Sequence, residues 1–370
     1  MIWVWVGFIL FVLLMLALDL GVFHRDARVV SVREALVWSA IWVSLGLAFA
    51  VFVYFGYENR WMGLGTVPDA VDGRINDGAS ATVKYLTGYV IEKSLSVDNI
   101  FVIAMIFAFM AVPRRYQHRV LFWGILGALV MRGAMIAVGA GLIARYHWIL
   151  YIFGAFLIVT AVKMLAIREH GDPTDNAVVR WTRRIFPVTE RFHGQHFAVR
   201  AGSARSRKAP EPGVIALPDD AVERAVPGTL MLTPLAVALI LVETTDLIFA
   251  VDSIPAIFAI TADPFLVFTC NVFAILGLRS LYFALADMID KFRFLKVSLA
   301  IILAIVGVKM LLADPLKDAF GPGFNIYLLV VVVVILGFGI LASKWTGPAV
   351  ESPARMDEER PRTVDRPPAA

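Results

Sequence analysis

The apolar residues of this chain fall into nine long runs that are separated by short polar breaks. Each run has about 20 residues or more, which is the length that a helix needs to cross about 30 Å of hydrocarbon. The pattern therefore predicts an all-α polytopic membrane protein. The expected spans cover residues 1–23, 34–56, 81–112, 117–142, 147–167, 229–262, 265–288, 295–313 and 325–343. The first run lacks a basic leader and a small-residue cleavage site, so we expect it to remain as a helix.

Composition strengthens this prediction. Of the 370 residues, 59% are hydrophobic and 17% are charged, compared with roughly 45–50% and about 25% in an ordinary soluble domain. This excludes a soluble globular enzyme. The single cysteine, Cys270, excludes an intrachain disulfide and any metal site built from several thiolates. The net charge of +4 comes mainly from loops on one side, so we expect no nucleic-acid binding.

Loop charges predict the orientation. The connections after the first, third, fifth and seventh runs are rich in arginine and lysine, whereas the intervening ones hold few basic residues. The basic loops should be cytoplasmic, which places the N-terminus outside and the C-terminus inside a bacterial cytoplasmic membrane. Residues 1–343 then form one transmembrane domain, with a long cytoplasmic loop at 169–228 and a disordered tail at 344–370. The loop is either a variable linker or a docking site for a partner, and its residues 187–197 are the stretch that could fold locally.

Charged residues inside the runs repeat with nearly constant spacing. Asp98 precedes Arg132 by 34 residues, and Lys163 follows 31 residues later. Asp246 precedes Arg279 by 33 residues, and Lys309 follows 30 residues later. Since three spans are an odd number, the second copy must cross the membrane in the opposite sense. The sequence therefore predicts an inverted repeat of residues 81–167 and 229–313, with Lys163 and Lys309 reaching the membrane interface.

The two runs that begin these repeats carry most of the intramembrane acids, and each such carboxylate is costly enough to suggest a function. A broken helix near Pro255 would expose the carbonyl of Val251 beside Asp252. One straight helix cannot direct all the acids to one point, because residues six apart differ by about 120°. Either a kink or two facets of a cavity solve this, or some acids pair with arginines. We expect a mixture. The candidate metal ligands are Asp19, Glu92, Asp98, Asn99, Glu243, Asp246 and Asp252, and the candidate charge-compensating residues are Arg132 and Arg279.

The chemistry of these side chains limits the ion. All six histidines fall in loops or at the ends of spans, so a buried site would use oxygen ligands only. Oxygen suits manganese, magnesium or calcium better than zinc, copper or nickel. Clustered carboxylates can also take up protons when no cation is bound, which would suit exchange of a metal ion against protons. We expect a divalent cation as substrate and no cofactor.

Three segments resemble the signature segments of the TerC/Alx family of integral membrane proteins. They begin at Glu92 (EKSLSVDNIFV), at Glu243 (ETTDLIFAVDSIPAIF) and at Asn271 (NVFAILGLRSLY). The family takes its name from tellurium resistance, and the resemblance implies manganese export from the bacterial cytoplasm. It also implies that the family's intramembrane acids correspond to Asp19, Glu92, Asp98, Glu243, Asp246 and Asp252, and its arginine to Arg279.

Two functions of different classes follow. The first is a transporter that exports divalent metal ions, Mn²⁺ above all. The alternative is a non-transporting membrane component of a stress-resistance or secretion-linked assembly, which would contact a cytoplasmic partner through the loop at 169–228. An enzyme is not expected, because the sequence shows no nucleophile arrangement, paired-aspartate protease motif or HExxH motif.

Overall fold

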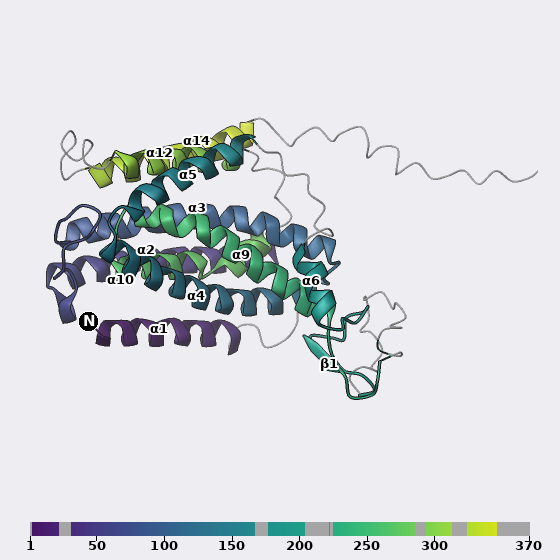
Figure 1. Ribbon diagram of the computed structural model, residues 1–370. Helices are drawn as coiled ribbons and strands as arrows, with labels where there is room; N and C mark the ends of the chain where they lie inside the picture. Colours follow the sequence, from purple (N-terminus) through teal and green to yellow (C-terminus); the bar gives the residue numbers. More distant parts are fainter. Residues whose placement is uncertain are drawn as a thin grey trace, which may run out of the picture.

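The computed structural model describes residues 2–21, 31–166, 177–203, 222, 225–285, 294–312 and 324–345. Long helices run side by side along one direction and form the body of the molecule (Figure 1). They are α1 (Ile2–Gly21), α2 (Val32–Glu58), α3 (Gly78–Phe109), α4 (Arg114–Arg145), α5 (Ile149–Ala166), α9 (Pro234–Phe258), α10 (Pro264–Ile275), α11 (Leu278–Leu285), α12 (Leu295–Leu311) and α14 (Phe324–Trp345). Shorter elements lie at the ends: η1 (Trp61–Gly63), α6 (Ala177–Ile185), β1 (Ala198–Arg200) and β2 (Leu230–Leu232).

Six helical segments of the described residues are long and apolar enough to cross a membrane, if α10 and α11 are taken together. The others are α2, α4, α5, α9 and α14. Helices also cover the remaining predicted spans, because α1, α3 and α12 fall in those ranges. Among them, α3 is interrupted by several charges, and the apolar part of α1, Ile2–Leu18, is shorter. The integral membrane character is thus supported, whereas nine crossings stay a prediction.

The beginnings of three helices are set by local sequence. Ser31 accepts a hydrogen bond from the backbone of Glu34 at the start of α2. Asp77 and Ser80 form a reciprocal capping box at the start of α3. Asp263 accepts from two backbone N–H groups at the start of α10. Each cap satisfies donors that the first turn of a helix leaves without an intrahelical partner.

Of the alternatives for the acidic helices, a break near Pro255 is not the one that the structure shows. Helix α9 continues through Pro255 to Phe258, because a proline in the last turn removes only one hydrogen bond near an end that is already open. The break lies instead in the following span, where α10 ends and Gly277 has a φ of 83°. The carbonyls of Ala274 and Leu276 at this break accept hydrogen bonds from the ammonium group of Lys93, at 3.0 and 3.4 Å.

Substitution of Gly277 by alanine should destabilise the protein by about 2–4 kcal/mol, since a left-handed conformation and overpacking each cost about 1–3 kcal/mol. A Cβ atom at this position would lie 2.6 Å from the Cβ of Trp42. Unfolding can be followed with a thiol-reactive dye, because the single cysteine, Cys270, is only 1% exposed. Gly7→Ala is the matched control, since nothing lies within 4 Å of its added Cβ. Equal unfolding midpoints for both variants would contradict the prediction.

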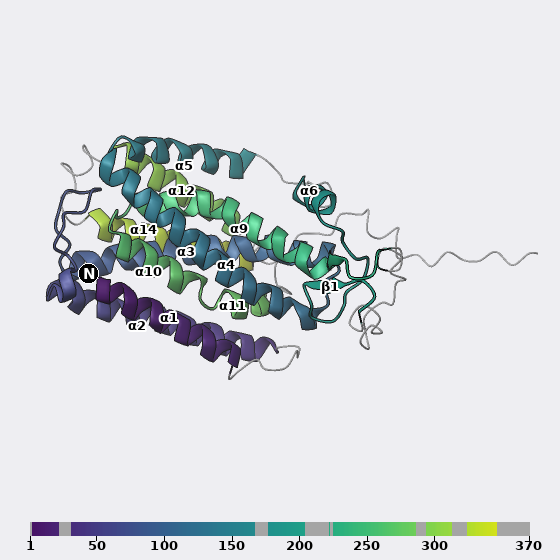
Figure 2. The same cartoon turned by 60° about the horizontal axis from the view of Figure 1, so that its bottom comes forward.

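Equivalent parts of the two predicted repeats pack in matching ways. Helix α3 packs on α10, and α9 packs on α4. Helices α5 and α12, which end the two repeats, lie side by side in Figures 1 and 2 and approach closely. A Cβ atom on Gly154 would lie 3.1 Å from the carbonyl oxygen of Gly307, and one on Gly307 would lie 2.9 Å from that of Gly154. This reciprocity is what an inverted repeat requires, and the repeat itself stays a prediction.

The two ends of the bundle differ. The connection between α2 and α3, residues 59–77, lies at one end, and α6 with the β1–β2 sheet lies at the other (Figure 1). Strands β1 and β2 are antiparallel, with Val199 opposite Met231. Residues 187–197 fold onto this sheet, since Thr189 donates to the carbonyl of Leu232 at 2.8 Å. Part of the long loop is therefore folded, while residues 204–221 and the tail from 346 lie outside the described residues.

Candidate functional site

Arg132 of α4 joins two of the predicted acids. Its Nε and Nη2 atoms donate to the two carboxylate oxygens of Asp246 at 3.2 and 3.0 Å. Its Nη1 atom donates to Glu92 and also lies 3.1 Å from the Oδ1 atom of Asn271 and 3.3 Å from the hydroxyl of Ser253. The arginine thus links α3, α4, α9 and α10.

This Arg132 cluster, made of Arg132, Glu92, Asp246, Ser253 and Asn271, is almost fully buried. The side chain of Glu92 is 0% exposed and that of Arg132 is 2% exposed, while Asp246 reaches 18%. A single guanidinium thus contacts two carboxyl side chains, of which that of Glu92 is buried and that of Asp246 is partly exposed. In this conformation the carboxylates of Glu92 and Asp246 face a protein cation.

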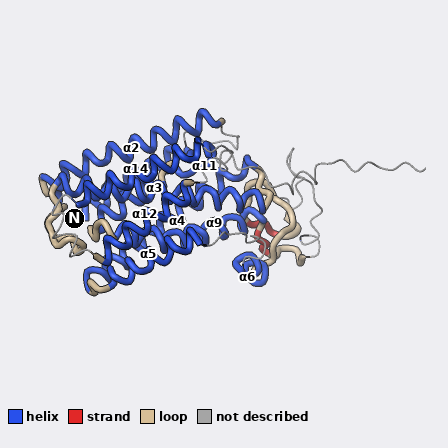
Figure 3. The backbone as a smooth tube through the Cα atoms, turned by 90° about the horizontal axis from the view of Figure 1, so that it is seen from above, coloured by secondary structure: helices blue, strands red, loops and turns tan. Residues whose placement is uncertain are grey.

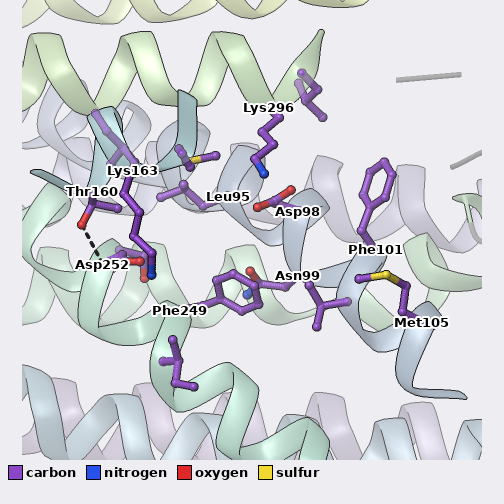
Figure 4. A pocket seen from close by; sticks show the side chains of 16 residues that line it. Leu95, Asp98, Asn99, Phe101, Met105, Thr160, Lys163, Phe249, Asp252 and Lys296 are labelled. Atoms are coloured by element: carbon purple, nitrogen blue, oxygen red, sulfur yellow. Dashed lines mark hydrogen bonds between the residues drawn. The ribbon is translucent and has the colours of Figure 1, made fainter. Parts of the chain in front are cut away.

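A second group of polar residues surrounds a cavity of about 350 Å³ between α3, α5, α9 and α12. Asp98 and Asn99 come from α3, and Asp252 comes from α9 (Figure 4). The carboxylate of Asp252 accepts a hydrogen bond from Thr160 of α5 at 3.1 Å. Two lysines, Lys163 and Lys296, also line the cavity, and in Figure 4 the Lys296 side chain points toward Asp98.

Asn99 and Ser253 lie between the two groups. Asn99 lines the large cavity and also a smaller one of about 20 Å³ beside Arg132 and Asp246. Ser253 lines the large cavity and accepts from Arg132. The large cavity and the Arg132 cluster are therefore adjacent and share polar side chains.

Glu243 belongs to neither group. It lies one turn before Asp246 on α9, and its carboxylate packs against Gly127 of α4, where a side chain would clash. Its Oε2 atom is buried and has no hydrogen-bond partner among the described residues. Asp19 is in α1, but its side chain lies outside the described residues. Arg279, in α11, is 3% exposed.

The predicted acids do not form a single cluster. Within the described residues, no three His, Cys, Asp or Glu side chains come together in a group that could hold a metal ion. Spacing along the helices explains the separation, because Asp98 is six residues from Glu92 and Asp252 is six from Asp246. Each pair is rotated by about 120° around its helix. Two facets result, one toward Arg132 and one toward the large cavity.

Lys309 contacts protein groups near the end of α9, and its place at the membrane interface stays a prediction. It is 9% exposed, and its ammonium group donates to the carbonyl of Ala259 at 2.8 Å and to Asn325 at 3.1 Å. The open C-terminal end of α9 offers that carbonyl, and the C-terminal end of a helix attracts a cation. Lys163, by contrast, is exposed along the large cavity.

Sequence reasoning missed a buried ion pair at the end of the bundle that carries residues 59–77. The ammonium group of Lys84 lies 2.8 Å from both Asp69 and Asp72, and it donates to Asn76 at 2.7 Å. Asp69 also accepts from the hydroxyl of Thr261 and from the N–H of Ala262 at 2.9 Å. The signal was a lysine early in an apolar run, 15 and 12 residues after two acids. These contacts bind the α2–α3 connection to the α9–α10 connection.

Comparison with known proteins gives the family. The model of the family described as "Integral membrane protein TerC family" matches residues 77–350, which include the Arg132 cluster and the large cavity. The chain belongs to the TerC family of integral membrane proteins. The TerC match also covers the connection between α9 and α10 and the folded part of the long loop.

Several bacterial TerC relatives are similar over nearly their whole length. A protein of Myxococcus xanthus, described as an uncharacterized membrane protein, is 47% identical over 92% of this chain and 91% of that protein. Proteins of Photorhabdus laumondii and Escherichia coli K12 are each 42% identical over 89% of this chain and 93% of the relative. Both carry the name "Putative membrane-bound redox modulator Alx". No solved structure matches this chain.

Proposed function

We propose that this TerC protein is a membrane transporter that exports divalent metal ions, Mn²⁺ above all, from the cytoplasm in exchange for protons. The observation that supports it best is the large cavity between α3 and α9, into which each helix contributes one carboxylate. Asp98 and Asp252 supply the charge, and Asn99 and Thr160 supply further oxygen ligands. Hard divalent cations prefer such oxygen ligands.

The lysines of the cavity suggest how the negative charge of its carboxylates is compensated when no metal ion is bound. Lys163 and Lys296 bring two positive charges to a site with two carboxylates. A divalent cation that enters would replace this compensation, and the long lysine side chains can move aside toward the membrane interface. After release of the cation, the carboxylates can take up protons, which would couple the two ion movements.

The Arg132 cluster then has a supporting role. It ties α3 to α9 through Glu92 and Asp246, so it fixes the two helices that carry the cavity carboxylates. Ser253 touches both places and follows Asp252 directly along α9. On this proposal, loss of Arg132 disturbs metal transport only through the position of α9.

The test is metal efflux by Asp98→Asn and Asp252→Asn in cells that lack their own manganese exporters. Asparagine keeps the size of the side chain and removes the charge, so we expect at least about a tenfold loss of Mn²⁺ efflux, since a lost charge at a buried ion site costs 1.4 kcal/mol or more. Cellular manganese, calcium and magnesium are measured by elemental analysis after a manganese load, at matched protein levels in the membrane. Glu190→Gln is the matched control, because Glu190 is exposed in the loop and should leave efflux unchanged.

Unchanged Mn²⁺ efflux in both aspartate variants would contradict the transporter proposal. The alternative, a non-transporting component of an assembly, predicts the opposite pattern. Deletion of residues 198–212 would then abolish resistance to metal or tellurite stress, and Asp98→Asn would not. Efflux and resistance are measured in the same strains, so the two functions are separated in one experiment.

The name of the relatives raises redox chemistry as a further possibility. Thiol–disulfide exchange needs an accessible thiolate. The single cysteine of this chain, Cys270, is 1% exposed, and its thiol donates to the carbonyl of Val267 inside α10. This burial favours ion transport over thiol exchange, and an effect on the redox balance of the cell would then follow from metal levels.

A further inference from the structure

Helix α6 (Ala177–Ile185) differs from the other helices in its direction. Figure 3 looks almost down its axis at the margin of the bundle, whereas the long helices cross the same view from side to side. It lies at the end of the bundle near the start of α9, on which it packs (Figure 1). An axis across the membrane helices, at their ends, is the placement of a helix that lies in the plane of the membrane interface.

The two faces of α6 are different. Val179 and Thr182 are 6% and 3% exposed and form the inner face. On the outer face, Trp181 is 65% exposed and Ile185, one turn later, is 48% exposed. Arg184 is exposed beside them, whereas Arg183 is exposed on the side of the helix that carries Val179. Packing on α9 therefore accounts for the burial of the inner face, whereas the apolar and basic residues of the outer face are not covered by α9.

The outer face has the chemistry of membrane anchoring. Tryptophan is enriched at the boundary between headgroups and acyl chains. Amphipathic helices that lie in this boundary pair such apolar residues with arginines that attract anionic lipids. A loop expected on the cytoplasmic side faces the leaflet in which anionic headgroups attract basic segments. A protein partner would need a surface that reaches the margin of the bundle at membrane depth, so the position of α6 favours lipid.

We propose that α6 binds anionic phospholipid headgroups through Arg184, with Trp181 and Ile185 inserted at the headgroup boundary. The site is separate from the metal cavity and does not depend on transport. It fixes the folded part of the long loop to the membrane surface, next to the start of α9. Arg184 should contribute roughly a fivefold factor to lipid binding.

The test places a nitroxide spin label at position 185 of the full-length protein by Ile185→Cys, which keeps Trp181. The chain without this substitution is the labelling blank, because its single cysteine, Cys270, is buried. Collisions of the label with oxygen and with a water-soluble nickel complex are measured in vesicles of phosphatidylcholine alone and in vesicles with one quarter phosphatidylglycerol. Arg200→Cys, at an exposed position of β1, gives the reference for a label in water.

With phosphatidylglycerol present, we expect the ratio of oxygen to nickel collisions at position 185 to exceed that at position 200 several-fold. Addition of Arg184→Gln should move the ratio toward the value at position 200. Equal ratios in the two vesicle types would overturn the role of anionic headgroups. If the label at position 185 behaves as the label in water does in both vesicle types, the proposal as a whole is overturned. The same holds if neither oxygen nor the nickel complex reaches the label, as would happen under a protein partner. Folding of each variant is checked by the unfolding midpoint reported by Cys270.

Discussion

Substitution of Arg132 by alanine should lower the free energy of unfolding by about 3–5 kcal/mol, because it leaves buried charges without their partner. The carboxylate of Glu92 would remain at 0% exposure with its ion-pair partner removed. Asp246 would lose both hydrogen bonds of its bidentate pair. Since these contacts connect α4 to α3 and α9, the substitution removes interactions between helices at the centre of the bundle.

The measurement is thermal unfolding in detergent, followed by the reaction of Cys270 with a thiol-reactive dye. Arg145→Ala is the matched control, because Arg145 is an exposed arginine at the end of the same helix and should change stability by less than about 0.5 kcal/mol. The triple variant Arg132→Met, Glu92→Gln and Asp246→Asn should recover part of the loss, since neutral partners remove the buried charges. If Arg132→Ala and Arg145→Ala have the same unfolding midpoint, the Arg132 cluster adds no stability.

Substitution of Lys84 by methionine should lower the free energy of unfolding by about 3 kcal/mol or more, for the same physical reason, near the start of α3. Methionine keeps most of the volume of lysine and removes the ammonium group between Asp69 and Asp72. The side chain of Asp69 is 0% exposed, although it keeps its bonds from Thr261 and Ala262. Arg74→Met is the control, because Arg74 is exposed in the same connection. A Lys84→Met protein as stable as this control would contradict the prediction.

Acid should weaken the same ion pair. Burial raises the pKa of the Asp69 carboxyl, but the Lys84 ammonium and the hydrogen bonds from Lys84, Thr261 and Ala262 lower it, and the pKa lies below the ordinary value of 3.8. A carboxyl whose folded pKa is lowered stabilises the fold above its unfolded pKa and loses this effect as the pH falls through the folded pKa. The unfolding midpoint should therefore be highest near neutral pH and fall below about pH 4. In Lys84→Met this acid-dependent loss should be smaller.

Charge positions were the most informative part of the sequence. Glu92, Asp246 and Arg132 stand out because charged residues are rare in apolar helices, and the structure brings these three together. Family membership followed from the segments around Glu92, Glu243 and Asn271 and is confirmed by the TerC match. Of the two alternatives for the acids, a break near Pro255 is absent from α9 and two facets are present, because position within the helix decides how much a proline disturbs it.

The sequence by itself determined that this is an integral membrane protein, since the free energy of burying apolar runs depends on composition and length. It also determined that Asp98 and Asp252 lie on other facets than Glu92 and Asp246, because the helical repeat fixes those angles. Only the tertiary structure decided which partner each facet meets: Arg132 for one, and a cavity with Lys163 and Lys296 for the other. The rotation of each helix against its neighbours depends on packing across the whole bundle. The ion pair of Lys84 with Asp69 likewise needed a connection to fold back onto α3.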